Sequence, residues 1–370
     1  MRVLYFAEWY GHGATAPFIR LGCFISQLGH EVYLGTSGRE AQSGVLNITG
    51  YENSHIQILP ETLGSKSCLI SGIREIRDLL TRVEIDIVHC QTIRELAIVA
   101  AACVTVEHRP ALVFSDHFSL SWDSIRRTIL KIAALIVSRS QYIALSTQQF
   151  KRILKIPFLR LRAWNIPNGI ALSEFMYVER TNESWGPTLI YPASFIPTKG
   201  HLKLLEMCAI LRGRGRDVLL FLAGDGPERD AVEQRSVELG LEDQVRFLGR
   251  IGQQELIRKM AEADIGVFPS YREMMPYSVL EMMATGLPVV AYEAGGVADS
   301  LESGRSGYLV PIGHKEMFLN RLTYLLDHPL ETRTMGKAAR ERVETHFALE
   351  VVAAKLIEVY KHVVRNGDNK

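Results

Sequence analysis

Short apolar segments alternate with amphipathic ones along most of this chain. The apolar segments include Arg2–Phe6, Glu31–Thr36 and Ala111–Ser115. Between them, Thr15–Leu28 and Leu69–Arg82 have apolar residues at helical spacing. Near-continuous apolar strands joined by helices are typical of parallel sheets that are covered on both faces. The pattern therefore predicts an α/β protein built from doubly wound, Rossmann-like sheets.

The same alternation continues through the second half. Further strands are expected at Ile56–Leu59, Ile85–Cys90, Tyr142–Leu145, Thr188–Pro192, Val218–Ala223, Val245–Leu248, Ile265–Phe268 and Pro288–Ala291. Further helices are expected at Ile93–Val104, Ser124–Val137, Leu202–Arg212, Arg229–Leu239, Gln254–Ala261, Val279–Thr285, Glu316–Leu326, Leu330–Thr345 and Leu349–Val364.

A loss of periodicity divides the chain. The segment PNGIALSEFMYVERTNESWGPT, beginning at Pro167, is rich in Pro, Gly, Asn and Ser and is interpreted as a linker. A chain of 370 residues also favours two domains. We expect them at residues 1–172 and 173–348, with ligands bound at the carboxyl ends of the strands and in the cleft between the domains.

Composition excludes several classes of protein. The chain is 47% hydrophobic and 22% charged with a net charge of +1, which is ordinary for a globular protein and gives no sign of nucleic-acid binding. Its 5 cysteines are scattered without a CxxC pair, which favours reduced thiols and a cytoplasmic location. The N-terminus reads as a buried strand, not a signal peptide, and no apolar stretch approaches the ~20 residues that span a bilayer.

Positive charge is concentrated in one segment. Residues 124–163 contain nine Lys and Arg and no acidic residue, interleaved with Ile, Leu, Phe and Trp. Such a segment suits an anionic membrane surface, and the alternatives are a solvated basic face or the wall of a cleft for an acidic substrate. The basic residues are Arg126, Arg127, Lys131, Arg139, Lys151, Arg152, Lys155, Arg160 and Arg162.

Two carboxylates flank an expected turn and helix start. Glu273 precedes Pro276, and Glu281 lies in the apolar helix that follows. A helix N-terminus attracts phosphate, and carboxylates accept hydrogen bonds from sugar hydroxyls. The spacing alone also fits a solvated helix face, and Glu281 also fits a structural partner such as an Arg or a backbone amide.

Other polar residues follow expected strands. His117 comes after Ala111–Ser115 and fits either a structural role or a contact with a sugar or phosphate. Lys199 begins a helix after Thr188–Pro192, where a cation conflicts with the helix dipole and so favours binding of a diphosphate. Gly11 and Gly13 follow the first strand, where they form either a tight turn or a close approach to a phosphate or sugar.

An ordered set of motifs resembles the family 4 retaining glycosyltransferases of the GT-B fold. The resemblance runs along nearly the whole chain. The motifs are GHEV (29–32), DIVH (86–89), PNGI (167–170), KG (199–200), AGDGPER (223–229), FLGR (247–250), ADIGVFPS (263–270), Glu273 and Glu281, ATGLPVVA (284–291), GG (295–296) and GYLVP (307–311).

The resemblance implies roles for these residues. Residues 1–172 would form the acceptor-side domain, with the last helix, 349–368, packed back on it, and 173–348 the nucleotide-sugar domain. Glu273 would contact the donor sugar, Glu281 the ribose and Lys199 the diphosphate. His117 would lie near the sugar. Backbone of Met274, Met275, Ser278 and Val279 would touch sugar and phosphate, Leu248, Gly249 and Arg250 would lie near the base, and Gly11 and Gly13 would line the phosphate or acceptor entrance.

The sequence departs from the family pattern twice. The usual Gly-Arg before Lys-Gly, whose Arg assists at the diphosphate, is here Ala193-Ser194. The common Gly-Phe-Gly between the two glutamates is Met-Met-Pro at 274–276, and Pro276 has no N–H to offer a donor. Charge on the leaving group would therefore fall to Lys199 and the helix start near Ser278, and no metal is expected because no DxD motif stands at a strand end.

The resemblance implies retaining transfer from a UDP- or GDP-linked sugar to a glycan or polyprenyl-linked acceptor. Together with the basic segment, it suggests bacterial surface polysaccharide or lipopolysaccharide assembly at the inner face of the cytoplasmic membrane. Two alternatives remain, a sugar-nucleotide epimerase of the same plan and a non-catalytic partner subunit that retains the fold.

Overall fold

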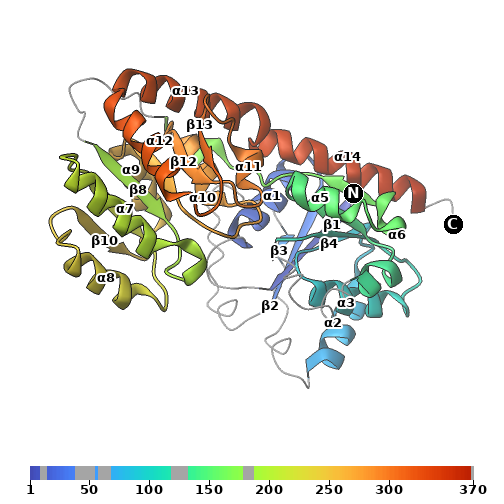
Figure 1. Ribbon diagram of the computed structural model, residues 1–370. Helices are drawn as coiled ribbons and strands as arrows, with labels where there is room; N and C mark the ends of the chain where they lie inside the picture. Colours follow the sequence, from blue (N-terminus) through green and yellow to red (C-terminus); the bar gives the residue numbers. More distant parts are fainter. Residues whose placement is uncertain (9–14, 38–54, 57–67, 118–131, 178–186, 368–370) are drawn as a thin grey trace. The chain divides into compact units, whose positions relative to one another are not determined.

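The computed structural model describes residues 1–8, 15–37, 55–56, 68–117, 132–177 and 187–367 (Figure 1). Contacts group the chain into two compact units. Unit 1 comprises Met1–Gly169 and Leu349–Lys370, and unit 2 comprises Ile170–Ala348. Each unit has a parallel sheet with helices, which confirms the predicted α/β class. The unit boundary after Gly169 lies close to the boundary expected after Leu172.

In the sheet of unit 1, the order in which successive strands are added reverses at β1. Its described strands lie in the order β3-β2-β1-β4-β5-β6-β7, so the chain builds outward from β1 to β3 and then crosses to β4. The point between β1 and β4 is therefore a topological switch point, where open α/β sheets bind ligands. The strands are β1 (Arg2–Glu8), β2 (Glu31–Ser37), β3 (His55–Ile56), β4 (Ile87–Cys90), β5 (Ala111–Ser115), β6 (Gln141–Ala144) and β7 (Ala163–Asn165).

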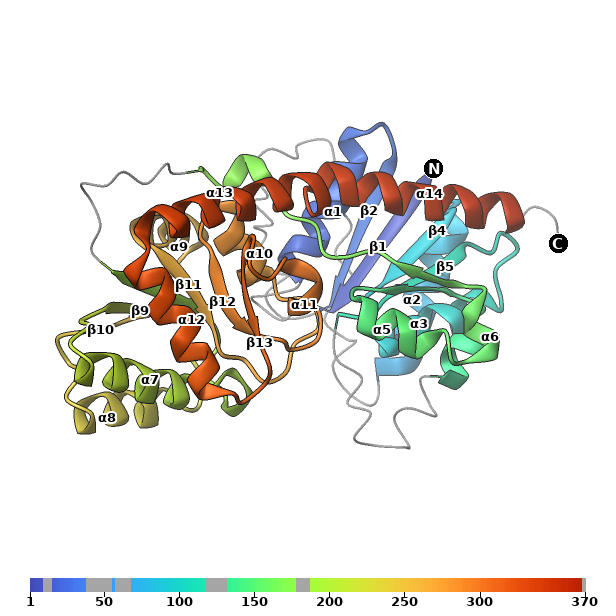
Figure 2. The same ribbon diagram turned by 45° about the horizontal axis from the view of Figure 1, so that its top comes forward.

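Helices cover both faces of this sheet (Figure 2). Helices α1 (Thr15–Gln27) and α14 (Leu349–Gly367) pack together on one face, so the C-terminal helix belongs to unit 1. Helices α2 (Cys68–Arg82) and α3 (Ile93–Cys103) pack on the opposite face with the buried side chains of β1, β4 and β5. Two short helices, α5 (Thr147–Ile153) and α6 (Pro157–Arg160), flank β6 and β7.

A buried polar chain joins α14 to the sheet. The hydroxyl of Tyr360 donates to the hydroxyl of Tyr5 at 2.8 Å and lies 2.6 Å from Nδ1 of His89. On its other side, Nε2 of His89 lies 2.6 Å from Oγ of Ser115. Burial lowers the pKa of His89 well below its usual value, so its ring is neutral. These contacts satisfy polar groups that would otherwise destabilise the core.

The sheet of unit 2 follows the same plan. Its described strands lie in the order β10-β9-β8-β11-β12-β13, and the switch point falls between β8 and β11. All the strand pairs within it are parallel. The strands are β8 (Thr188–Pro192), β9 (Leu219–Ala223), β10 (Val245–Gly249), β11 (Ile265–Phe268), β12 (Val289–Tyr292) and β13 (Gly307–Val310).

Most elements of unit 2 match the pattern, including the four-residue strands β11 and β12. The strand β13 and the helix α11, also four residues each, were not expected from the pattern. Helix α10 begins at Tyr277, two residues before the expected start, because Pro276 occupies its N-cap position with extended backbone angles. The helices are α7 (His201–Gly213), α8 (Arg229–Glu238), α9 (Gln253–Glu262), α10 (Tyr277–Ala284), α11 (Val297–Ser300), α12 (Lys315–Asp327) and α13 (Pro329–His346).

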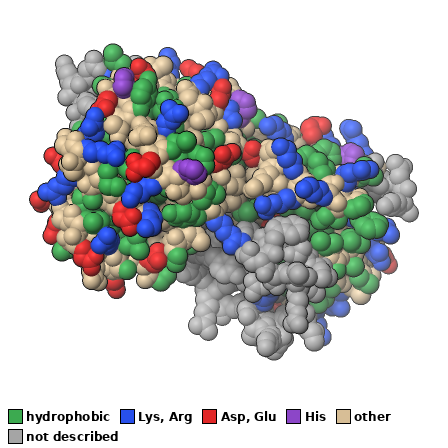
Figure 3. Space-filling model, viewed as in Figure 1, with side chains coloured by type: hydrophobic (Ala, Val, Ile, Leu, Met, Phe, Trp, Pro, Cys, Tyr) green, Lys and Arg blue, Asp and Glu red, His purple; other side chains and the backbone are tan. Residues whose placement is uncertain are grey.

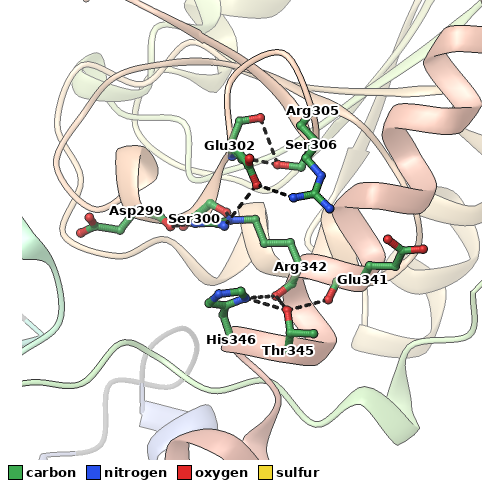
Figure 4. A network of polar contacts seen from close by, with 9 residues as sticks. All are labelled: Asp299, Ser300, Glu302, Arg305, Ser306, Glu341, Arg342, Thr345 and His346. Carbon is green, nitrogen blue, oxygen red and sulfur yellow. Dashed lines mark hydrogen bonds and ion pairs between the residues drawn. The ribbon is translucent and has the colours of Figure 1, made fainter.

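Two arginines of α13 hold the ends of α10 and α11. Arg340 donates to the carbonyl of Ala284, the last residue of α10, at 2.6 Å. Arg342 donates to the carbonyls of Asp299 and Ser300, at the end of α11, at 2.9 and 2.7 Å (Figure 4). Cations stabilise helix C-termini by satisfying their carbonyls and their negative dipole ends. Helix α13 therefore fixes the position of both short helices.

His201 is enclosed by aromatic rings in the core of unit 2. Its ring stacks on Phe195, with centroids 4.2 Å apart, and lies 4.9 Å from the ring of Tyr191. Neither ring nitrogen has a hydrogen-bond partner within the described ranges. Burial, and then the charge of Lys199, lower its pKa to about 4. The folded protein therefore holds His201 neutral at pH values where an unfolded histidine, with a pKa of about 6.5, takes up a proton.

We predict that His201→Phe reduces the sensitivity of the fold to acid. Because the folded pKa lies below the unfolded one, this histidine costs stability as pH falls below about 6.5, by about 2 kcal/mol between pH 8 and pH 5. Urea unfolding at both pH values measures the difference for wild type and variant. An exposed histidine, replaced in His108→Gln, is the control. An equal loss of stability in wild type and His201→Phe would contradict the assigned neutral state.

Candidate functional site

Lys199 and Glu273 form an ion pair at the switch point of unit 2. Lys199 follows β8 and Glu273 follows β11, and these strands are neighbours in the sheet. The two side chains are 20% and 9% exposed, so the pair is partly shielded from water. A shielded charge needs a partner, either within the protein or on a ligand. The structure thus brings together two of the residues that the sequence singled out.

Packing of one loop on another places Lys199. The residue ends a 3-10 turn, Pro197–Lys199, and its carbonyl accepts a hydrogen bond from the Tyr191 hydroxyl at 2.7 Å. Gly200 follows with φ +73°, and a Cβ there would lie 2.6 Å from the carbonyl oxygen of Pro269. Only glycine fits this left-handed position and this close approach. The turn that carries Lys199 is therefore docked on the segment that leads to Glu273.

A glycine pair supports the backbone of Glu273 and Met274. The N–H of Gly296 donates to the carbonyl of Met274 at 2.7 Å. A Cβ on Gly295 would overlap the carbonyl of Glu273, and one on Gly296 would overlap that of Met274. These glycines stand just before α11, whose far end Arg342 holds. The network of Figure 4 therefore fixes the far end of the helix that follows this glycine pair.

The start of α10 follows Glu273 directly. Met274 is half-buried. Met275 is buried, and its sulfur accepts a hydrogen bond from Oγ of Ser300 at 3.7 Å. Ser278 is half-buried and Val279 is fully buried. Glu281 is half-buried one turn further along the helix. The positive dipole end at this helix start suits an anion.

The other expected donor residues lie along the same edge of the sheet. Ser194, after β8, is exposed. Leu248 and Gly249 end β10, and Gly249 accepts a hydrogen bond from the N–H of Gly224 at 2.8 Å. Arg250 is exposed, and its Nε lies 3.7 Å from a carboxylate oxygen of Asp225. The side chain of Ser194 is uncharged, so it cannot supply the positive charge that an arginine would bring to this position.

His117 lies in unit 1, at the carboxyl end of β5. Its ring is edge-on to Phe18, with centroids 5.8 Å apart, and burial lowers its pKa to about 3. The preceding carboxylate, Asp116, accepts a hydrogen bond from the Tyr142 hydroxyl at 2.8 Å. His117 is therefore a neutral group that can donate or accept one hydrogen bond. Gly11 and Gly13 lie outside the described residues.

Several positioning residues escaped the sequence analysis. Arg340 and Arg342 are far in sequence from Lys199 and Glu273, while Tyr191 is near Lys199 but lies within an apolar strand, and the contacts of all three exist only in the folded unit. For Gly200 the sequence did offer a signal, because a glycine directly after a turn often takes the left-handed conformation that the structure shows there. The arginines gave no signal, because charged residues on a long helix usually face solvent.

Two family models match the chain. The model described as Glycosyltransferase Family 4 matches residues 13–174. The model described as Glycosyl transferases group 1 matches residues 179–342. The two matches follow one another along the chain, and the boundary between them falls within the expected linker.

Curated relatives match part of the chain. N-acetyl-alpha-D-glucosaminyl L-malate synthase of Bacillus anthracis is 32% identical over 153 residues, which is 41% of this chain and 40% of that protein. The lipopolysaccharide core biosynthesis glycosyltransferase LpsE of Rhizobium meliloti is 30% identical over 174 residues, which is 47% of this chain and 49% of that protein. The matched part spans less than half the length of these relatives.

Solved structures match the chain at full length. HepE of Anabaena, in complex with UDP and glucose, has a TM-score of 0.81 at 19% identity and covers 98% of this chain and 100% of its own. Sucrose-phosphate synthase of Thermosynechococcus elongatus has a TM-score of 0.82 at 20% identity, with 99% and 100% covered. At this identity the likeness shows the fold. With the consecutive family matches, it shows that the chain belongs to the family 4 glycosyltransferases and has the GT-B fold.

Proposed function

We propose that the protein is a retaining glycosyltransferase that uses a UDP- or GDP-linked sugar. The acceptor is a glycan or a lipid-linked sugar of bacterial surface polysaccharide or lipopolysaccharide assembly. The observation that carries the proposal is the Lys199–Glu273 ion pair at the switch point of unit 2. Relatives named for lipopolysaccharide core synthesis and similar structures that contain UDP and UDP-glucose support it.

The ion pair gives each group a partner that a donor can replace. When a nucleotide-diphosphate sugar binds, the ammonium of Lys199 turns to the diphosphate, and the carboxylate of Glu273 accepts hydrogen bonds from the sugar hydroxyls. Glu281 holds the ribose, and the first N–H groups of α10 meet the phosphate. Lys199 and Glu273 each have a polar partner both before and after the donor binds, so binding leaves neither charge isolated in a shielded site.

Bond cleavage leaves negative charge on the diphosphate. Lys199 and the N-terminus of α10 stabilise this charge, since Ser194 stands where relatives have an arginine, and the proposal requires no metal. The acceptor hydroxyl attacks from the face that the diphosphate leaves, and a phosphate oxygen takes the hydroxyl proton, so the anomeric configuration is retained. Neutral His117 contributes a hydrogen bond to a sugar and no charge.

The membrane role depends on a surface around α5 and α6. Lys151, Arg152, Lys155 and Arg160 are exposed there, and Figure 3 shows Lys and Arg side chains beside hydrophobic ones over these helices. Val137, Phe158 and Leu161 are 79%, 68% and 84% exposed. Basic and apolar side chains together favour an anionic lipid surface. Arg126, Arg127 and Lys131 lie outside the described residues, and no helix in the described part is long and apolar enough to cross a bilayer.

We propose that this basic apolar surface holds the protein peripherally on the inner face of the cytoplasmic membrane. A lipid-linked acceptor would be presented there. The match of charge between the surface and anionic headgroups supports this location.

Transfer is tested by incubating the protein with labelled UDP- and GDP-sugars and a bacterial membrane extract. Label should move to lipid or glycan in the wild type, and Lys199→Ala should lower the rate about 100-fold, since it removes the main charge at the leaving group. Lys203→Ala, which replaces an exposed lysine one turn away, should transfer normally. Conversion of the donor sugar into another sugar without transfer would indicate an epimerase. A donor that does not react would indicate a non-catalytic subunit.

Glu281→Ala should weaken binding of the nucleotide sugar by about 10-fold or more, because a carboxylate that accepts ribose hydroxyls makes charge-assisted hydrogen bonds. Titration calorimetry with UDP- and GDP-sugars measures the affinity. Glu238→Ala, on the exposed side of α8, is the matched control. Unchanged affinity in Glu281→Ala would remove the ribose role.

Reversing the charge of Lys151 and Arg152 to Glu should lower binding to anionic vesicles by about 30-fold or more, since each basic group at such a surface contributes about 1 kcal/mol. Sedimentation with phosphatidylglycerol-containing vesicles measures binding. The same reversal at Lys337 and Lys355, which are also exposed, controls for net charge. If both variants bind as the wild type does, the surface does not face the membrane.

A further inference from the structure

The switch point of unit 1 carries an uncharged polar side chain. Gln91 directly follows β4, which borders the switch point between β1 and β4. In unit 2 the corresponding place holds Lys199 and Glu273. In open α/β sheets, the loops on the two sides of a switch point lead in opposite directions, and ligands bind between them. Gln91 therefore lies where the fold itself favours binding.

The amide of Gln91 is buried without a partner. The residue is 1% exposed, and neither its side-chain nitrogen nor its oxygen has a hydrogen-bond partner in the described part of the chain. Buried side-chain amides are nearly always satisfied, because desolvating one without a new bond is unfavourable. An unsatisfied amide at a ligand-binding edge points to a ligand that supplies the missing bonds.

The backbone of Gln91 is fixed in place. Its N–H donates to Oε2 of Glu95 at 2.9 Å, and the N–H of Thr92 donates to the same oxygen at 2.8 Å. Oγ1 of Thr92 accepts in return from the N–H of Glu95 at 3.2 Å, which completes a capping box at the start of α3. The unsatisfied amide therefore belongs to a residue whose backbone is held at a helix start.

Gln91 lies beside the end of β5. Strands β4 and β5 are paired in parallel, with Cys90 opposite Phe114. One residue further, Gln91 comes level with Ser115, and His117 follows two residues later. Neighbouring strands are about 4.8 Å apart. Gln91 and the neutral His117 thus stand at adjacent strand ends on one edge of the sheet.

A second buried glutamine of unit 1, Gln149 in α5, shows the usual arrangement. Oε1 of Gln149 accepts from the N–H of Leu145 at 2.7 Å, and its Nε2 donates to the Tyr142 hydroxyl at 2.8 Å. Its amide joins β6 to α5 and serves the fold. Gln91 has no such bonds among the described residues, so a structural role does not account for its amide.

We propose that Gln91 binds the acceptor by hydrogen bonding to hydroxyl groups of a sugar ring. An amide donates and accepts, as a hydroxyl does, so Gln91 suits a neutral, polyhydroxylated group. The proposal depends on the proposed glycosyltransferase function, in which unit 2 holds the nucleotide donor.

The test compares Gln91→Met with Gln149→Met. Replacing an unsatisfied amide by an apolar side chain of similar size should leave the melting temperature unchanged or raise it, while Gln149→Met should lower it. Methyl α-glucoside, methyl α-mannoside and methyl N-acetyl-α-glucosaminide serve as probes, observed by saturation-transfer NMR in the presence of UDP. At least one should bind the wild type and Gln149→Met, and bind Gln91→Met at least tenfold more weakly. The UDP-induced thermal shift should be the same in all three proteins.

A fall in melting temperature for Gln91→Met as large as that for Gln149→Met would assign the amide to the fold and overturn the proposal. Equal glycoside binding by wild type and Gln91→Met, or binding of no glycoside by the wild type, would overturn it as well. Failure of the proposed function has a different signature. In that case the wild type transfers no sugar from any donor, whatever the glycosides do at Gln91.

Discussion

The ion pair between Lys199 and Glu273 is the interaction on which the site of unit 2 depends. Two opposite charges, both largely shielded from water, stand at the ends of the neighbouring strands β8 and β11. Such charges are tolerable only when each has a partner. A diphosphate and a sugar offer partners of the matching kinds, which is why the proposed function assigns the donor to this pair.

Much of the surrounding structure serves to hold this pair. Gly200 lets the Lys199 turn approach Pro269, and Gly295 and Gly296 let another loop support the backbone at Glu273. Arg340 and Arg342 hold the far ends of the two short helices that begin beside these loops. The geometry of the site therefore rests on close backbone contacts and on a helix more than fifty residues away in sequence.

The two units place different chemistry at equivalent points of similar sheets. Unit 2 presents charged groups and a helix start, which suit a diphosphate. Unit 1 presents Gln91 and His117, and burial keeps the His117 ring neutral. Uncharged polar side chains such as these suit hydroxyl groups, which both donate and accept hydrogen bonds. This difference is the physical basis for our proposal that donor and acceptor bind to different units.

The sequence by itself determined the α/β class and most long elements, because hydrophobic periodicity is a local property, and it singled out Lys199 and Glu273 as candidates through their motifs. It did not reveal β7, α5, α6 or α11, which are short and lack the continuous apolar run that marked short strands such as β11, and it did not reveal β13. Only the tertiary structure joined Lys199 to Glu273, satisfied Gln149 and left Gln91 without a partner. Hydrogen bonding and burial are set by residues distant in sequence, so no local pattern could distinguish these two glutamines.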